Sequence, residues 1–232
     1  MNQDRRNGIT IGILYIAAAV TSIIAVILYE PVLSDQWHMT AANGWTTKVL
    51  VGVLNDLLLV VSAIGTAAML FPYLRRWNEQ LALGHLCFRF MEAVCIAVGV
   101  VSILGLLQLS IDYDANGLAT EAGLYEVGYL LQSVHRWTFM LGPNFMLGLN
   151  TAMYSYLLYR TGLVPRPLAL FGIVTAALVF TAGLLEMFGV VQPLSAVKGI
   201  IALPVGVYEM SLAVWLIAKG FHKESLKKLR AG

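Results

Sequence analysis

Residues 81–109 read LALGHLCFRFMEAVCIAVGVVSILGLLQL, an apolar run that carries only two charged side chains, Arg89 and Glu92. A helix of about 20 mostly apolar residues spans the hydrocarbon core of a bilayer, so this run predicts a transmembrane helix. Side chains three residues apart share one face of a helix, which lets Arg89 and Glu92 interact directly. Because a charge at the bilayer centre costs about 2.5–3.5 kcal/mol on insertion scales, both are expected to be paired or to face a wet cavity.

The rest of the chain repeats this apolar pattern. Of its 232 residues, 59% are hydrophobic and 12% are charged, with a mean hydropathy of +0.76, whereas soluble domains carry about 25% charged residues. We therefore predict a single integral membrane domain over residues 1–232 with an all-α fold, a polytopic bundle of about six transmembrane helices. The predicted spans are approximately 9–29, 47–72, 81–109, 138–159, 167–190 and 194–218.

The distribution of Lys and Arg predicts the orientation of these spans. Arg5 and Arg6 precede the first span, and Arg75 and Arg76 lie between the second and third. Arginines also flank the link between the fourth and fifth spans, and a basic tail follows the sixth. All four groups fall on the same side of a six-span path. Cytoplasmic loops are enriched in Lys and Arg, so both termini are expected in the cytoplasm and the protein in the inner (cytoplasmic) membrane. The formal net charge of +2 gives no reason to expect a nucleic-acid partner.

The polar segment 110–137 is predicted to contain a short helix on the outer surface. Residues 112–117 read DYDANG, which is typical of a turn. Leu118, Tyr125, Tyr129 and Leu130 then recur at roughly helical spacing. This helix is expected to run into the fourth span near Trp137, although an irregular loop explains its first half equally well.

Several polar side chains fall inside the predicted spans, and their depth follows from a rise of about 1.5 Å per residue. Four of them are expected to share a layer near the midplane of the bilayer, with Asn144 adding a neutral amide close by. Prolines within the fourth and sixth spans, Pro143 and Pro204, allow kinks that would open a polar pocket. The predicted ligand-binding or proton-exchanging residues are Asp56, Arg89, Glu92, Asn144 and Glu209.

Glu186 and Lys198 lie near the outer ends of the fifth and sixth spans, across a tight turn. Buried ion pairs often serve only to fix the register of packed helices. We therefore interpret this pair as a structural ion pair.

The midplane residues are compatible with three functions. In a small-molecule or proton-coupled transporter or ligand-binding protein, Arg89 would hold an anionic group while Asp56, Glu92 or Glu209 exchanges protons. In an intramembrane enzyme acting on a lipid or a quinone, the same carboxylates would serve as acid and base. The third function is a non-catalytic membrane component that packs against a partner protein. Six helices are few for a gated path, so a homo-oligomer is a further expectation.

Catalytic and cofactor motifs give no direction. The chain has no P-loop, no dinucleotide-binding glycine fingerprint, no H-E-x-x-H and no G-x-S-x-G. His38 and His135 fall on the predicted outer side, where solvated loop histidines are a better explanation than metal ligands. No metal site is predicted, and neither a cofactor nor an enzymatic activity can be assigned.

Residues 88–93, FRFMEA, look like a recurring motif of a bacterial family of multi-pass membrane proteins that is catalogued only as a domain of unknown function. Similar matches are residues 141–143 (LGP), 157–160 (LLYR), 163–166 (LVPR), 208–210 (YEM) and 215–221 (WLIAKGF). The resemblance covers nearly the whole chain. It implies a six-helix membrane domain and draws attention to Arg89, Glu92 and Glu209, but it implies no reaction and no substrate.

Overall fold

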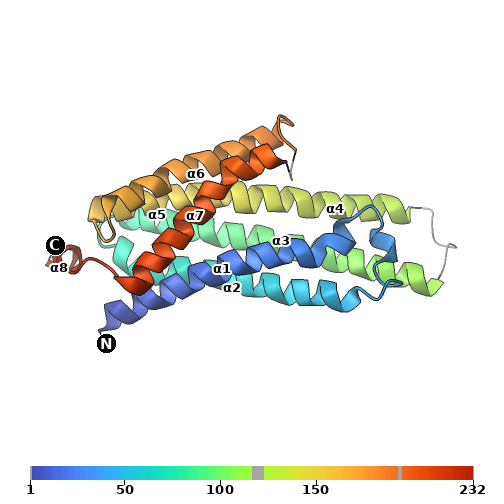
Figure 1. Ribbon diagram of the computed structural model, residues 1–232, viewed down its shortest axis with the longest axis horizontal. Coiled ribbons are helices and arrows are strands. Elements are labelled where there is room, and N and C mark those ends of the chain that lie inside the picture. Colours follow the sequence, from blue (N-terminus) through green and yellow to red (C-terminus); the bar gives the residue numbers. More distant parts are fainter. Residues whose placement is uncertain (1, 117–122, 193–194, 232) are drawn as a thin grey trace.

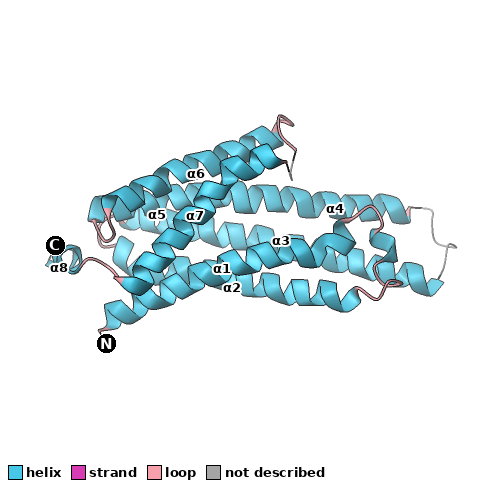
Figure 2. Cartoon of the chain, viewed as in Figure 1, coloured by secondary structure: helices cyan, strands magenta, loops and turns pink. Residues whose placement is uncertain are grey.

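A computed structural model of the chain describes residues 2–116, 123–192 and 195–231, which form helices joined by short turns, without strands (Figure 2). Leu118, which was predicted to belong to the short surface helix, lies outside the described residues. The elements are α1 (Gln3–Leu33), η1 (Trp37–Met39), α2 (Thr46–Leu74), α3 (Glu79–Asn116), α4 (Leu124–Met140), η3 (Leu141–Met146), α5 (Leu147–Thr161), α6 (Arg166–Met187), α7 (Ala196–Ala218) and α8 (Lys223–Ala231).

The helix ends follow local sequence signals. Asn2 and Ser195 accept backbone N–H bonds at the starts of α1 and α7, which is the usual role of Asn and Ser at an N-cap. Gly162 and Gly220 end α5 and α7 with φ of 64° and 73°, a left-handed conformation that suits glycine at a helix C-terminus.

Five helices are long and apolar enough to cross a membrane: α1, α2, α3, α6 and α7. The remaining predicted span, the fourth (138–159), lies in a helix that runs on from α4 through η3 to α5. The η3 segment is a π-helix that contains Pro143. Proline has no N–H to donate, and this explains why the backbone hydrogen-bond pattern changes from α to π at this point. The polytopic helical bundle is therefore confirmed.

The five apolar helices and the segment from α4 to α5 form a closed ring. Each contacts its neighbours along the chain, and α7 returns to pack against α1. Both termini lie at the same end of the bundle (Figure 1). We call this the terminal end and the opposite end the distal end.

The helices differ in length at the distal end. With 38 residues, α3 is about 57 Å long, far more than the roughly 30 Å hydrocarbon core, and α4 continues the line of α5 beside it (Figure 1). The helices α6 and α7 have 22 and 23 residues and stop short of this extension. The predicted short helix is present as α4, and it continues through η3 into α5 as expected. It packs along α3, where Gly105 lies against Leu131 of α4.

Apolar side chains gather in two separate clusters. One, near the terminal end, includes Leu70, Leu74 and Leu216; the other, near the distal end, includes Val49, Val100 and Ile103. Arg89 and Glu92 of α3 lie between these clusters along the chain. The fold thus places this buried ion pair between two apolar layers.

Glycine allows the close approach of α6 and α7. A Cβ added at Gly172 would lie 2.2 Å from the Tyr208 ring and 2.4 Å from Ser155 Oγ, whereas one added at Gly206 of α7 meets nothing within 4 Å. Small residues at such crossings are a general feature of membrane helix packing.

Gly172→Ala is expected to destabilise the protein by about 1–3 kcal/mol, the usual cost of overpacking. Gly206→Ala is the matched control and should leave stability unchanged or raise it slightly. Thermal unfolding of both variants in detergent would measure the difference, and equal stability of the two would refute the close approach.

The predicted orientation can be tested by cysteine labelling. In a background with Cys87 and Cys95 replaced by Ala, a membrane-impermeant maleimide should label Asn43→Cys in intact cells and Glu224→Cys only after lysis. Both positions are exposed, one at the distal end and one on α8. The reverse labelling pattern would show that the termini face outward.

Candidate functional site: a buried arginine shared by two glutamates

Arg89 lies inside the helix ring with only 2% of its surface exposed. Its guanidinium donates to both oxygens of Glu92, at 3.3 and 3.1 Å, and its Nε donates to the Ala63 carbonyl of α2 at 3.3 Å. The Asn150 amide of α5 donates a further bond of 2.9 Å to Glu92. The predicted pairing along one face of α3 is present, and it is fixed by groups from two other helices.

Glu209 approaches the same arginine from α7. Its Oε1 lies 3.6 Å from Arg89 Nη1, and this oxygen has no hydrogen-bond partner among the described residues. Glu92 is 6% exposed and Glu209 is 8% exposed. One buried cation is therefore shared by two carboxylates, one held tightly and the other loosely. We call Arg89, Glu92, Asn150 and Glu209 the central cluster.

Aromatic side chains surround the central cluster. The Arg89 guanidinium carbon lies 5.9 Å from the centre of the Tyr15 ring, within the range of a cation–π contact. Tyr154 lies 6.2 Å from Tyr15 and stacks on Tyr208 at 5.9 Å. Ser155 donates a hydrogen bond of 2.8 Å to the Tyr208 hydroxyl. These rings come from α1, α5 and α7 and help to close the ring of helices around the charges.

His85 completes this layer toward the terminal end. It is fully buried, with its ring 5.1 Å from that of Tyr154. Asn150 interacts with the His85 imidazole. This contact does not have ordinary hydrogen-bond geometry, because neither ring nitrogen has a hydrogen-bond partner among the described residues. His85 and Asn150 together are therefore incompletely satisfied polar groups inside the bundle.

Asp56 lies apart from the central cluster. It is seven residues along α2 from Ala63, or about 10 Å toward the distal end. Its carboxylate interacts with Tyr29 of α1, although neither Asp56 Oδ1 nor the Tyr29 hydroxyl reaches hydrogen-bond geometry. The predicted layer of four charges therefore forms with three, and Asp56 occupies a second polar position.

Asn144 is also separate. It lies in the π-helical η3, is 4% exposed, and its side-chain Nδ2 has no hydrogen-bond partner among the described residues. It packs against Gly183 of α6, where an added Cβ would meet Asn144 Cβ at 3.0 Å. The structure thus brings Asn150 rather than Asn144 to the central cluster.

Glu186 and Lys198 form an ion pair of 2.5 Å between α6 and α7, with both side chains less than 10% exposed. Their pairing across the turn is as expected from the sequence, and their structural role stays a prediction.

The two outer histidines are packed rather than solvated. The His38 ring lies 5.2 Å from that of Tyr113 and 5.3 Å from that of Tyr125. His135 belongs to α4, where it lies 3.3 Å from the Gly99 carbonyl. Both side chains are only partly exposed, so the expectation of freely solvated loop histidines is wrong: His135 lies on a helix, and two tyrosine rings pack against His38. Among the described residues no three His, Cys, Asp or Glu side chains gather closely enough to hold a metal ion.

Sequence reasoning did not select Tyr15, Tyr154, Tyr208 or His85 for the site. Aromatic residues are common in membrane helices, so no local pattern marks these four. Their signal is position, since Tyr208 directly precedes Glu209, and His85 lies one turn before Arg89.

Removing Arg89 should be far more damaging than removing the charge of Glu209. Arg89→Met leaves two buried carboxylates without a cation, and breaking a buried pair in this way typically costs about 3–5 kcal/mol. Glu209→Gln should change stability by about 1 kcal/mol or less, the net value of one hydrogen bond. Unfolding of the purified variants in detergent measures both.

The triple variant Arg89→Met, Glu92→Gln, Glu209→Gln serves as the control for the charge argument. It should recover much of the stability lost in Arg89→Met, since no unpaired charge remains. No loss in Arg89→Met, or no recovery in the triple variant, would contradict the shared ion pair.

Comparison with known proteins identifies the family of the chain but brings no function with it. No curated protein and no solved structure matches the chain. The family model described as "Domain of unknown function (DUF4386)" matches residues 10–220, which include every residue of the central cluster. Because the match covers most of the chain, the chain belongs to the DUF4386 family.

Proposed function

We propose that this protein is a proton-exchanging membrane transporter, with Glu209 as the group that takes up and releases the proton. The observation that supports this is the sharing of Arg89 between two carboxylates on different helices, with Glu209 the more loosely held. If both glutamates are ionised, the central cluster carries a net charge of −1 in a region of low dielectric constant. A proton on one of them is the cheapest way to remove that charge.

Glu209 is better suited than Glu92 to exchange a proton. Glu92 accepts bonds from Arg89 and from Asn150, all of which favour its ionised form. Glu209 has a single contact with Arg89, at 3.6 Å. It also lies on α7, whose internal Pro204 weakens the backbone hydrogen bonding one turn earlier. Protonation of Glu209 would release α7 from α3 and allow the closed ring to open.

The surroundings favour a cationic small molecule over an anion as the transported ligand. Arg89, predicted to hold an anionic group, already uses its Nε and Nη1 donors to bind the Ala63 carbonyl and Glu92. The loosely held carboxylate and the rings of Tyr15, Tyr154 and Tyr208 would instead attract an organic amine, through charge and through cation–π contacts. In this proposal a proton and an amine compete for Glu209. The enzyme alternative gains no support from the described residues, since the Ser155 hydroxyl donates to Tyr208 rather than to a carboxylate.

A proton count tests the proposal without a known ligand. When a pH indicator follows an acid pulse given to purified protein in lipid nanodiscs, Glu209→Gln should take up roughly one proton fewer per molecule than the wild type. The pulse is kept above about pH 6, where ordinary exposed carboxylates, with an unperturbed pKa of about 4.3, take up no proton. Glu79→Gln is then the matched control, because Glu79 is exposed in the first turn of α3.

In liposomes loaded with a pH-sensitive dye, small organic amines added outside should drive proton release from wild type and Glu79→Gln but not from Glu209→Gln. Equal proton uptake by wild type and Glu209→Gln, with no amine-dependent proton movement, would overturn the proposed function.

A further inference from the structure

The terminal end carries a pocket in which half of the lining residues are basic. Its volume is about 230 Å³. The cationic side chains that line it come from α1, from the end of α7 and from α8, and none belongs to the central cluster. They are Arg5, Lys219, Lys223, Lys227 and Arg230.

The turn after α7 builds this pocket. Gly220 ends α7 in a left-handed conformation, which sends the chain into α8 beside Arg5. Phe221 and Leu226 are buried in the terminal apolar cluster and hold α8 against the bundle. Lys223 and Lys227 are one turn apart on α8, so they share a face of this helix.

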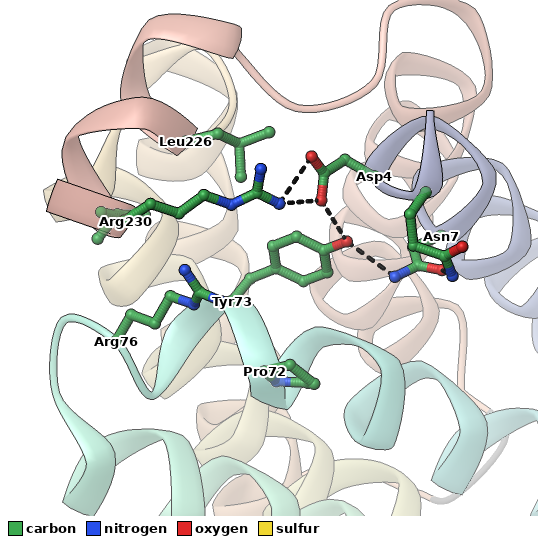
Figure 3. A pocket seen from close by; sticks show the side chains of 9 residues that line it. Asp4, Asn7, Pro72, Tyr73, Arg76, Leu226 and Arg230 are labelled. Atoms are coloured by element: carbon green, nitrogen blue, oxygen red, sulfur yellow. Dashed lines mark hydrogen bonds and ion pairs between the residues drawn. The ribbon is translucent and has the colours of Figure 1, made fainter. Parts of the chain in front are cut away.

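Two of the five cations are already engaged by the protein. The Arg5 guanidinium donates to the carbonyls of Leu216 and Ile217 at the end of α7. Arg230 binds both oxygens of Asp4, at 2.7 and 2.9 Å, and Asp4 in turn accepts a bond from Tyr73 (Figure 3).

Asp4 is the single acidic side chain that lines the pocket. Lys219 and Lys223 form no ion pair with any described residue, and Lys227 reaches only the exposed Glu224, at 3.9 Å. The pocket therefore keeps a surplus of positive charge.

We propose that this pocket binds the phosphate-bearing headgroup of an anionic membrane lipid, with Lys219 and Lys223 as its principal contacts. Clusters of Lys and Arg next to a membrane span attract anionic lipids. A lipid is favoured over a soluble phosphate compound because the pocket begins where the apolar span of α7 ends, at Ala218. From that point toward the distal end, α1 and α7 both carry exposed apolar side chains, among them Ile13 and Val214. These side chains can contact an acyl chain.

Binding of the headgroup would also change the contact between the first and the last helix. Arg230 joins the last helix to the first through Asp4, and both line this pocket. An anionic group beside them would compete with Asp4 for Arg230. Lipid binding would then be accompanied by a shift in the position of α8.

Native mass spectrometry of the full chain from nanodiscs of mixed phosphatidylcholine and phosphatidylglycerol tests the proposal. Wild type should retain phosphatidylglycerol preferentially, and Lys223→Gln should weaken that retention about fivefold, the typical share of one lysine at an anionic surface. Lys228→Gln is the matched control, since it makes the same charge change on the same helix at a position that does not line the pocket.

Loss of the preference in Lys223→Gln but not in Lys228→Gln supports the site. No preference in the wild type, or an equal loss in both variants, overturns it. A third arm measures the binding of free glycerol phosphate to lipid-free protein in detergent. If that binding depends on Lys223 while phosphatidylglycerol is not retained, the ligand is soluble and the lipid assignment is wrong. None of these outcomes depends on Glu209. A failure of the lipid proposal can therefore be told apart from a failure of the proposed function.

Discussion

The organisation of this protein depends on one buried guanidinium in a medium that does not solvate charge. Arg89 can occupy the interior of a membrane bundle only because α3 supplies Glu92, α7 supplies Glu209 and α2 supplies a backbone carbonyl. The first and last membrane segments are in contact, and the arginine lies at the centre of the ring that they close. Buried ion pairs of this kind add little net stability but penalise every arrangement that leaves one partner alone. The cluster therefore specifies how the helices meet.

The packing around the cluster follows from that constraint. Apolar clusters occupy the terminal and distal parts of the bundle, and glycines such as Gly172 let helices approach closely enough for tyrosine rings to seal the layer between them. The unequal lengths of the helices produce a distal extension. The terminal end is fastened differently, through the ion pair of Arg230 with Asp4 and the capping of α7 by Arg5.

Much of this fold is predictable from sequence, because hydropathy, helix rise and the positions of Lys and Arg report on single helices. Arg89 with Glu92, and Glu186 with Lys198, were predictable since each pair is close along the chain or across one turn. Contacts between segments that are distant in the sequence were harder to predict. Depth estimates have errors of several residues, which is enough to misplace Asp56 by two turns and to favour Asn144 over Asn150. The continuation of α4 into the fourth predicted span was expected from the sequence, but its packing along α3 was not, because that contact joins segments that no local pattern relates.

Infrared difference spectroscopy tests the central claim most directly, because a protonated carboxylic acid has its own C=O stretching band. Spectra would be recorded while the pH is varied for three proteins in an Asp56→Asn background, because Asp56 is a further buried carboxyl group: the background itself, and the same protein with Glu92→Gln or Glu209→Gln added. The shared-arginine account predicts a buried carboxylic acid band in the background that titrates with pH and is absent after Glu209→Gln. After Glu92→Gln the band should appear only at lower pH, because Arg89 then neutralises Glu209 alone. A titrating band that is unchanged by Glu209→Gln, or no such band in the background at any pH, would contradict the account.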